Sequence, residues 1–582
     1  MRIKEWQKIA LVVVLTLFVG VLFYTTLFRV TTEVSLDVKP GSFLQLNLSG
    51  EIPERVVENP IAEVIGGLPN ISIQDIVLNI HKAKRDKNIS GILLHLGPLG
   101  IGWGKLDEIR NALQSFHAAG KKIYTYLEMA GDAEYYLASV SDTITTIPTA
   151  IFMVNGLVSE PLFMKGTLQK LGIEADFVAH GKYKNAPDIF TRESMSDAQR
   201  EVLNAILDEY YQRLVDTLSV SRGLSRTETQ SILDKGLLNG REALAMGLVD
   251  TLMYFNELKT HLTGKDDSKR RILGFKQYRK VQPEGTDIST SDALAIVYGV
   301  GSIVIGGEKP YEYDNLITSE GMANSIRKAA ENKRVKAIIL RIDSPGGSGV
   351  ASDVIWKEVV KAREKKPIIV SISDLAASGG YYISMAADTI VAHPGSIVGS
   401  IGVFAGKFAM GKFYNKIGMN TEKLQRGRNA DFFLTSQPFT PEQRKILRHH
   451  IMTFYEDFLQ KVAQGRHMSV EEVDKIAQGR IWSGKQGYQN GLVDVLGDFN
   501  TAVRIAKEMA NLPVDKPVPL LIYPRIKSFW ERLLLEGFQN FATQPVFPLS
   551  SLPEPLQNMV KAIPYFQTGE PLFLPPFIVD IN

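Results

Sequence analysis

The pattern of hydrophobic and polar positions contains one apolar run that is long enough to cross a lipid bilayer. Residues Ile9–Phe28 include no charge and are rich in Val, Leu and Phe. At about 1.5 Å rise per residue, a helix of this length spans roughly the 30 Å hydrocarbon core of a membrane. Arg2, Lys4 and Lys8 precede the run and are opposed by Glu5 alone. An excess of basic residues on this side favours a cytoplasmic N-terminus.

Two other interpretations of this run are a cleaved signal peptide and a buried core helix. A signal peptide usually has a shorter apolar region that is followed by small residues at a cleavage site. The residues Tyr24–Arg29 offer no such site. We therefore predict a cytoplasmic N-terminus at residues 1–8, a transmembrane anchor at residues 9–28, and a large domain outside the cytoplasm after Arg29.

Beyond this segment, short apolar runs alternate with helical stretches. Gly91–Leu96, Ala337–Ile342 and Pro367–Ser371 have the length and the branched side chains of buried parallel strands. A helical stretch such as Ala351–Glu364 lies between two of them. Alternating strands and helices predict an α/β fold with a mostly parallel sheet.

Two capping signals predict where long helices begin. Ser196 is followed three residues later by Gln199, and Thr440 is followed by Pro441 and then by Gln443. A hydroxyl side chain with Gln three positions on is typical of a capping box, and proline is favoured at the first helical position. We expect a helix to start after each hydroxyl residue.

The chain also repeats itself over a long period. Residues 91–185 align with residues 337–431 at a constant offset of 246 and without a gap. Further along the offset becomes 244, where Gly247–Asp250 matches Gly491–Asp494. A period this long indicates a duplicated domain and not a solenoid. The predicted organisation after the anchor is a first repeat at 40–262, a linker rich in charged residues and glycine at 263–292, a second repeat at 293–511, and a Pro-rich C-terminal extension at 512–582.

Composition narrows the chemistry. The 582 residues are 45% hydrophobic and 22% charged, with a formal net charge of +3. This balance gives no sign of a nucleic-acid partner. The absence of cysteine excludes disulfides, thiolate metal sites and a cysteine nucleophile.

The second repeat contains two motifs that suit acyl transfer. A predicted strand runs into the turn Asp343–Gly349, whose paired glycines let backbone N–H groups point at an oxyanion or a phosphate. The next strand leads to Ser378, which lies between small residues at the start of a predicted helix. There its hydroxyl is accessible and the N–H of Gly379 lies beside developing negative charge. The simpler interpretation of Ser378 is a helix N-cap.

Comparison of the two repeats separates two halves of a site. Ser378 aligns with Asp132, and Pro345–Gly347 aligns with Leu99–Ile101, so the first repeat lacks the nucleophile and the glycine turn. Conversely, Lys184 of the first repeat aligns with Ala430. We infer that the two halves meet across the interface between the repeats.

A serine nucleophile needs a base. None of the nine histidines lies in a recognisable catalytic signature, and His393 is the one serious alternative. A lysine can serve if burial lowers its pKa from about 10.4. Lys182 and Lys184 would share a strand face, so alternation cannot choose between them.

The segments Arg341–Gly347 and Ala377–Tyr382, together with Tyr183-Lys184 and Phe190–Met195, resemble the signal peptide peptidase A family in its long bacterial form. The resemblance implies a duplicated Clp protease/crotonase-type fold. It also implies Ser378 as nucleophile, Lys184 as general base, the N–H groups of Gly347 and Gly379 as oxyanion hole, and Ser400 as a residue that orients the lysine. Asn185 stands where the family commonly has Ser, and Asp188-Ile189 replaces a usual Glu-Pro.

The same resemblance implies a membrane-anchored serine endopeptidase that degrades cleaved signal peptides at the periplasmic face of the bacterial inner membrane. It implies a homotetramer, contact with membrane lipid through the anchor, and neither a cofactor nor a metal. Two alternatives come from other classes of protein. One is an inactive anchored protein that binds extended peptides, and the other is a crotonase-type acyl-CoA enzyme, whose fold also uses paired N–H groups around an oxyanion.

Overall fold

The computed structural model describes residues 38–56, 71–264, 271–281, 291–307, 316–525 and 572–573. The predicted anchor at 9–28 lies outside these residues. Across the part of the chain that the structure describes, no helix combines the length and the apolar character that a bilayer span requires.

The first repeat is built on a six-stranded parallel sheet. Its strand order is β10-β1-β2-β3-β5-β9, and every neighbouring pair is parallel. The predicted buried strand at residues 91–96 forms the middle of β2, and Ile92 and Leu94 have no exposed surface. The elements in chain order are β1 (Ser42–Gly50), α3 (Ile73–Arg85), β2 (Ile89–Leu99), α4 (Trp103–His117), β3 (Lys122–Leu127), β4 (Met129–Ala130), α5 (Asp132–Ala138), β5 (Thr143–Thr146), β6 (Ile151–Phe152), α6 (Lys165–Leu171), β7 (Glu174–His180), α7 (Asp188–Thr191), α8 (Asp197–Arg222), α9 (Arg226–Leu233), β8 (Leu238–Asn239), α10 (Gly240–Ala245), β9 (Thr251–Leu252), α11 (Phe255–Thr263), β10 (Ile272–Gly274) and α13 (Phe275–Arg279).

The second repeat has a sheet of the same kind. The main path is β20-β18-β16-β14-β11-β22, and β17 and β21 continue from β16 as a branch. All its pairs are parallel except β18 with β20. The elements are β11 (Ala293–Val300), β12 (Ser302–Val304), β13 (Leu316–Thr318), α14 (Ser319–Glu331), β14 (Val335–Ser344), β15 (Gly347–Ser348), α15 (Gly349–Arg363), β16 (Ile368–Ala377), α16 (Gly379–Ser384), β17 (Thr389–Ala392), β18 (Ile397–Gly399), β19 (Val403–Ala409), α17 (Gly411–Lys416), α18 (Pro441–Arg466), α19 (Val470–Ile476), β20 (Ile481–Ser483), α20 (Gly484–Gln489), β21 (Val495–Leu496), α21 (Phe499–Met509), β22 (Leu520–Tyr523) and β23 (Leu572–Phe573).

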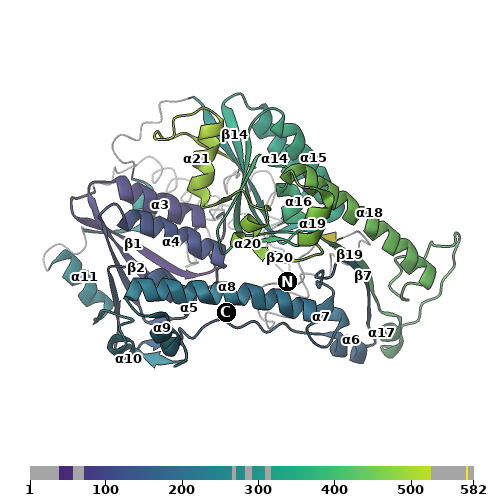
Figure 1. Cartoon of the computed structure of the whole chain (residues 1–582), viewed down its shortest axis with the longest axis horizontal. Helices are drawn as coiled ribbons and strands as arrows, with labels where there is room; N and C mark the ends of the chain where they lie inside the picture. The colour runs from purple at the N-terminus through teal and green to yellow at the C-terminus, as the bar shows by residue number, and fades with distance from the viewer. Residues whose placement is uncertain are drawn as a thin grey trace, which may run out of the picture.

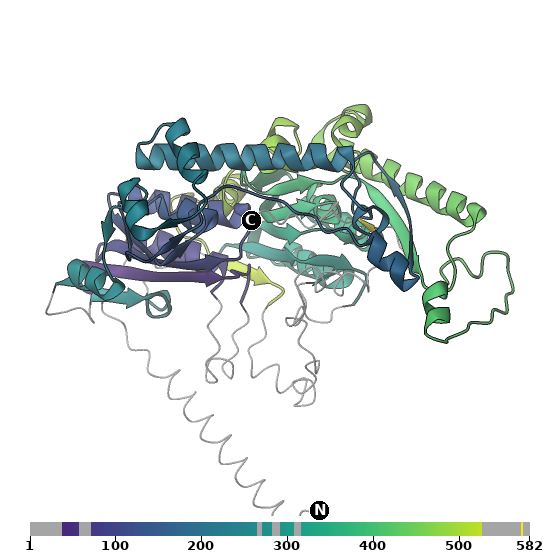
Figure 2. The same ribbon diagram turned by 90° about the horizontal axis from the view of Figure 1, so that it is seen from below.

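These two sheets confirm the predicted α/β class and the duplication. Both predicted caps are also present, since Ser196 and Thr440 accept hydrogen bonds from the N–H groups of Gln199 and Gln443. In Figure 1 the first repeat lies at the left, the second lies above and to the right, and α8 runs beneath both. Figure 2, seen from below, shows α8 lying across the assembled repeats.

A further sheet joins the two repeats. Its order is β13-β12-β15-β23-β19-β7, so β7 of the first repeat becomes an edge strand beside β19 of the second. The two strands are antiparallel and paired over seven positions, from Val403 with His180 to Ala409 with Glu174. This pairing fixes where the chain after β7 emerges relative to the second repeat.

Two stretches differ from the sequence prediction. The segment 263–292, predicted as a linker, contains β10, which extends the first sheet beside β1, and α13. Leu273, Phe275 and Tyr278 are buried there. These three side chains dock the segment on the first repeat, although most of its other residues are polar or charged. The C-terminal extension likewise contributes β22, which pairs with β11, and β23.

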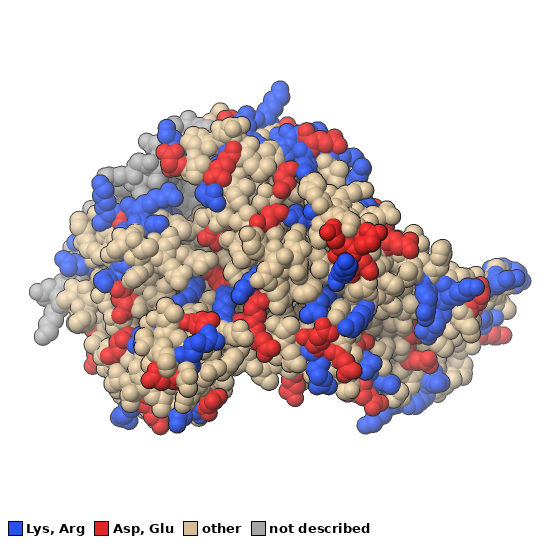
Figure 3. Space-filling model, viewed as in Figure 1, with Lys and Arg blue, Asp and Glu red and all other residues tan. Residues whose placement is uncertain are grey.

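Charge does not single out a patch on the face seen in Figure 3. Acidic and basic side chains are interspersed over it, above the elements of both repeats.

Candidate active site

Ser378 lies at the junction of β16 and α16, in a backbone conformation that is rare for a residue with a side chain. Its φ is 53° and its ψ is −111°. Its N–H donates a hydrogen bond of 2.7 Å to the carbonyl of Gly399, which holds the turn in place. Such conformations cost on the order of 1–3 kcal/mol and persist only where the surroundings enforce them.

The N-cap interpretation of Ser378 fails in the structure. The residue occupies the cap position of α16, yet its side chain makes no capping hydrogen bond. The Oγ atom instead lies 2.8 Å from Lys184 Nζ. The serine is fully buried, so this contact is made out of reach of bulk water.

Lys184 reaches the serine from the first repeat. It follows the last residue of β7 by four positions, and the β7–β19 pairing carries it to the second repeat. Its Nζ atom lies 3.0 Å from both the carbonyl oxygen and the Oγ of Ser400. A neutral amine has two N–H donors and one lone pair. The two Ser400 oxygens can accept the donors, which leaves the lone pair for the Ser378 hydroxyl.

Burial sets the protonation of this lysine. The side chain of Lys184 is only 3% exposed, and desolvation holds its pKa well below the ordinary value of 10.5. No carboxylate offsets this effect. A lysine in a dry site without a counter-ion favours the neutral form, which is the form that can accept a proton.

The structure separates Lys184 from Lys182, which the sequence could not do. Both residues lie beyond His180, where β7 ends, so the expected shared strand face is wrong. The Lys182 ammonium is exposed and contacts the Tyr183 hydroxyl at 2.9 Å and Glu201 at 3.2 Å. The turn directs one lysine to solvent and the other into the interface.

The turn that carries Lys184 is held by the second repeat. The N–H of Tyr183 donates to the carbonyl of Gln478 at 2.7 Å. Gly479 packs so closely that a Cβ atom there would lie 2.5 Å from the backbone nitrogen of Lys184, and its φ of +79° also favours glycine. Sequence analysis missed Gly479, because a lone glycine in a turn carries no signal of its own.

The two predicted oxyanion glycines are neighbours. A Cβ atom on Gly379 would lie 3.2 Å from the Gly347 backbone nitrogen and 2.7 Å from Ser352 Oγ, so the two glycines approach each other closely. Gly347 has a φ of +148°, and a Cβ there would lie 2.0 Å from the carbonyl oxygen of Ile303. As the first residue of α16, Gly379 has an N–H with no acceptor inside the helix.

Ser400 lies in a turn of the second repeat and contacts Lys184 from there. Its φ is 53°, and its N–H donates to the carbonyl of Arg480 at 2.7 Å. Both its Oγ and its carbonyl oxygen therefore face Lys184 Nζ from a fixed backbone. The prediction that this serine orients the lysine is compatible with that geometry.

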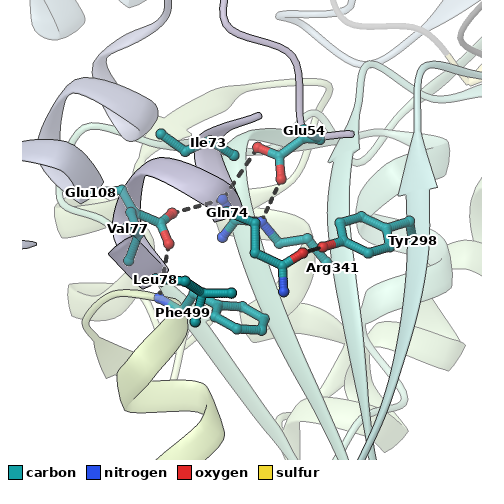
Figure 4. A pocket seen from close by; sticks show the side chains of 9 residues that line it. All are labelled: Glu54, Ile73, Gln74, Val77, Leu78, Glu108, Tyr298, Arg341 and Phe499. Carbon is teal, nitrogen blue, oxygen red and sulfur yellow. Dashed lines mark hydrogen bonds and ion pairs between the residues drawn. The ribbon is translucent and has the colours of Figure 1, made fainter. Parts of the chain in front are cut away.

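His393 lies in a different group of buried residues. Its Nε2 is 3.2 Å from Glu108, whose other neighbour is Arg341. Figure 4 shows the Arg341 side chain between Glu54 and Glu108. Burial raises the pKa of Glu108, but the positive charge of Arg341 and, to a smaller extent, the contact with His393 lower this pKa to about 2. His393 is thus engaged in an ion network between the repeats, and the serine contacts Lys184 instead.

A second ion cluster ties the repeats together beside the site. Lys105 of α4 lies 2.8 Å from Asp343 and 3.0 Å from Asp374. One carboxylate precedes the glycine turn and the other precedes Ser378. The cluster therefore fixes the two strand ends relative to the first repeat. Within the described residues, no group of three or more His, Asp or Glu side chains is arranged to hold a metal ion.

Comparisons with known proteins assign both repeats to one family. The model of "Peptidase family S49" matches residues 115–268 and 361–513, two matches whose starts differ by the 246 residues of the internal offset. The chain is 35% identical to "Serine protease SPPA, chloroplastic" of Arabidopsis thaliana over 83% of this chain and 71% of that protein. It is 33% identical to "Protease 4" of Salmonella typhi over 84% of this chain and 83% of that protein.

Among solved structures, a ClpP1 mutant of Listeria monocytogenes aligns with 36% of this chain and 94% of its own, at 15% identity and a TM-score of 0.23.

Proposed function

The chain belongs to peptidase family S49 and is a serine peptidase, and we propose that it is a membrane-anchored endopeptidase that degrades cleaved signal peptides through a dyad of Ser378 and Lys184. The observation that carries the proposal is the 2.8 Å distance between Ser378 Oγ and Lys184 Nζ in a fully buried site. The two groups come from different repeats, and neither repeat holds both.

In the first half of the reaction, the lone pair of neutral Lys184 accepts the hydroxyl proton while Ser378 Oγ attacks the peptide carbonyl carbon. The carbonyl oxygen becomes negative, and the N–H groups of Gly347 and Gly379 donate to it. When the C–N bond breaks, Lys184 returns the proton to the leaving amine, and the acyl group stays on the serine oxygen as an ester.

In the second half, a water molecule replaces the amine. Lys184 accepts a proton from the water, the oxygen attacks the ester carbonyl, and the same two N–H groups bind the new oxyanion. Collapse of this intermediate returns the proton to Ser378 and releases the carboxylic acid. Ser400 keeps the lysine oriented in both halves through its two oxygens at 3.0 Å.

The surroundings of the dyad support the proposed substrate class. An apolar cluster that includes Met164, Leu168, Phe190 and Phe404 lies beside the turn that carries Lys184. It offers buried surface to aliphatic side chains, which is what the central region of a signal peptide presents. The proposed anchor at residues 9–28 would hold the site near the membrane where such remnants remain. The periplasmic location and the homotetramer belong to the same proposal.

The test uses the full chain in detergent. A fluorophosphonate probe is expected to label the wild type at Ser378, and Ser378→Ala is expected to lose the label together with about 10⁴-fold or more of its turnover of a synthetic signal peptide. The control substrate is a polar peptide of equal length, which should be cleaved more slowly. An unlabelled serine in active, folded protein would contradict the dyad, and faster cleavage of the polar peptide would contradict the substrate class.

A further inference from the structure

A segment from the end of the chain lies inside the sheet that joins the two repeats. Leu572 and Phe573 form β23, the short yellow strand beside β19 in Figure 1. On one side β23 is antiparallel to β15, with Phe573 opposite Gly347 and Leu572 opposite Ser348. On the other side it is antiparallel to β19, with Leu572 opposite Phe404.

The two strands that flank β23 are both connected to the proposed site. β15 begins at Gly347, whose N–H is assigned to the oxyanion hole. β19 pairs with β7, the strand that leads to Lys184. In the sheet order, β23 is the one strand between β15 and β19. The slot that β23 fills is therefore one strand wide, with β15 and β19 as its two edges.

Leu572 is buried in an apolar cluster close to the turn that carries Lys184. It is only 3% exposed and packs within the apolar cluster with Met164, Leu168, Phe190 and Phe404. Phe190 belongs to α7, which begins four residues after Lys184. Phe404 belongs to β19. Both repeats thus build the cluster, and a leucine of the C-terminal segment lies within it.

A peptide that enters such a slot bonds to both edges. Strand addition supplies main-chain hydrogen bonds, and pockets for individual side chains supply selectivity. A slot that is one strand wide holds either β23 or a substrate, and never both. A tethered segment competes at an effective concentration in the millimolar range, which few free peptides reach.

We propose that the C-terminal segment around Leu572 occupies the substrate slot in cis, so that the enzyme is inhibited by its own tail. This inference rests on the proposed function, because it takes the slot to be the substrate site. A peptide then binds only when the tail leaves the slot, and an apolar peptide beside a membrane, at high local concentration, is the kind of competitor that displaces it.

The sequence around β23 suits an inhibitor better than a substrate. Pro571 precedes the strand, and Pro575 and Pro576 follow soon after it. Proline has no N–H for a ladder and fixes its own φ. These residues limit how far the segment can pair as a strand.

The first experiment compares wild type with Leu572→Asp, both as full chains in detergent, on an apolar fluorogenic peptide. A buried leucine accounts for an equilibrium factor of about ten or more. We expect KM to fall about tenfold in the variant while kcat stays the same, because the tail competes with substrate and is absent at saturation. Leu424→Asp is the matched control, since Leu424 is 91% exposed. An unchanged or higher KM in a Leu572→Asp variant that melts like wild type would overturn the proposal.

A second experiment separates this inference from the proposed function. In a Ser378→Ala background no turnover is needed, and binding of a labelled apolar peptide is measured by fluorescence anisotropy with and without Leu572→Asp. Tighter binding in the Leu572→Asp protein supports occupation of the slot by the tail, even if no peptidase activity were found. Equal binding overturns it even if Ser378 were proven catalytic. Mass spectrometry of incubated wild type should find the tail intact, and a tail shortened by a Ser378-dependent cut would make it a substrate and overturn its inhibitory role.

Discussion

Lys184 Nζ lies 2.8 Å from Ser378 Oγ, although 194 residues separate the two along the chain. The lysine comes from the first repeat and the serine from the second. Each repeat has lost what the other keeps, since Asp132 stands at the serine position and Ala430 at the lysine position. Neither repeat therefore contains the pair by itself, and the contact between the two side chains exists only at the interface between the repeats.

Replacement of the buried lysine should abolish most activity, whereas replacement of its neighbour should not. Lys184→Ala is expected to lower kcat by about 10²–10⁴-fold, the usual contribution of a general base. Lys182→Ala is the matched control, because its side chain is 61% exposed and contacts Glu201 at the surface. Turnover of an apolar peptide at pH 7 measures both. Near-normal rates for Lys184→Ala would show that another group accepts the serine proton.

The same lysine should make the protein less stable at neutral pH. Its folded pKa is well below 10.5, so the unfolded chain binds a proton there that the folded protein excludes. Stability is therefore lost as the pH falls from about 10.5 toward the folded pKa. Lys184→Met should melt at least about 2 °C above wild type at pH 7, and the difference should shrink as the pH approaches 10.5. Thermal unfolding across this range tests the sign, and a variant that is less stable at pH 7 would contradict it.

Ser400 should act as a positioning residue, with a signature in the pH profile. Its Oγ lies 3.0 Å from Lys184 Nζ and can accept a hydrogen bond from the ammonium form of the lysine. Without this acceptor the charged form is less favoured, so the acidic limb of kcat/KM should move to lower pH in Ser400→Ala. Loss of orientation should also lower kcat by up to about 10²-fold. A lower kcat with an unmoved limb would indicate a purely structural role.

Gly479 should be required for the position of the lysine and not merely for its turn. A Cβ there would lie 2.5 Å from the backbone nitrogen of Lys184. Gly236 has nearly the same φ, +78°, but nothing lies within 4 Å of the place of its Cβ. Both Gly→Ala changes pay a strain of about 1–2 kcal/mol. Only Gly479→Ala should also lose activity, and equal activity in the two variants would refute the clash.

Much of the fold could be predicted from local patterns. Buried strands such as β2 and β14 are short runs of branched apolar residues, and the starts of α8 and α18 are marked by Ser196 and Thr440. The docking of β10 and α13 was missed, because three apolar residues in a charged stretch give no periodicity to detect.

By itself, the sequence determined the duplication, the α/β class, the division of candidate groups between the repeats, and Ser378 and a lysine at position 182 or 184 as candidates for the site. These features can be recognised from periodicity, from the repeat offset and from local motifs, none of which requires knowledge of tertiary contacts. Only the tertiary structure decided between Lys184 and Lys182, removed His393 from the serine, and put Leu572 in the slot beside Gly347. Burial and contact depend on residues far apart in the chain, and their physical effect, desolvation of an amine or occupation of a groove, exists only after the repeats have packed together.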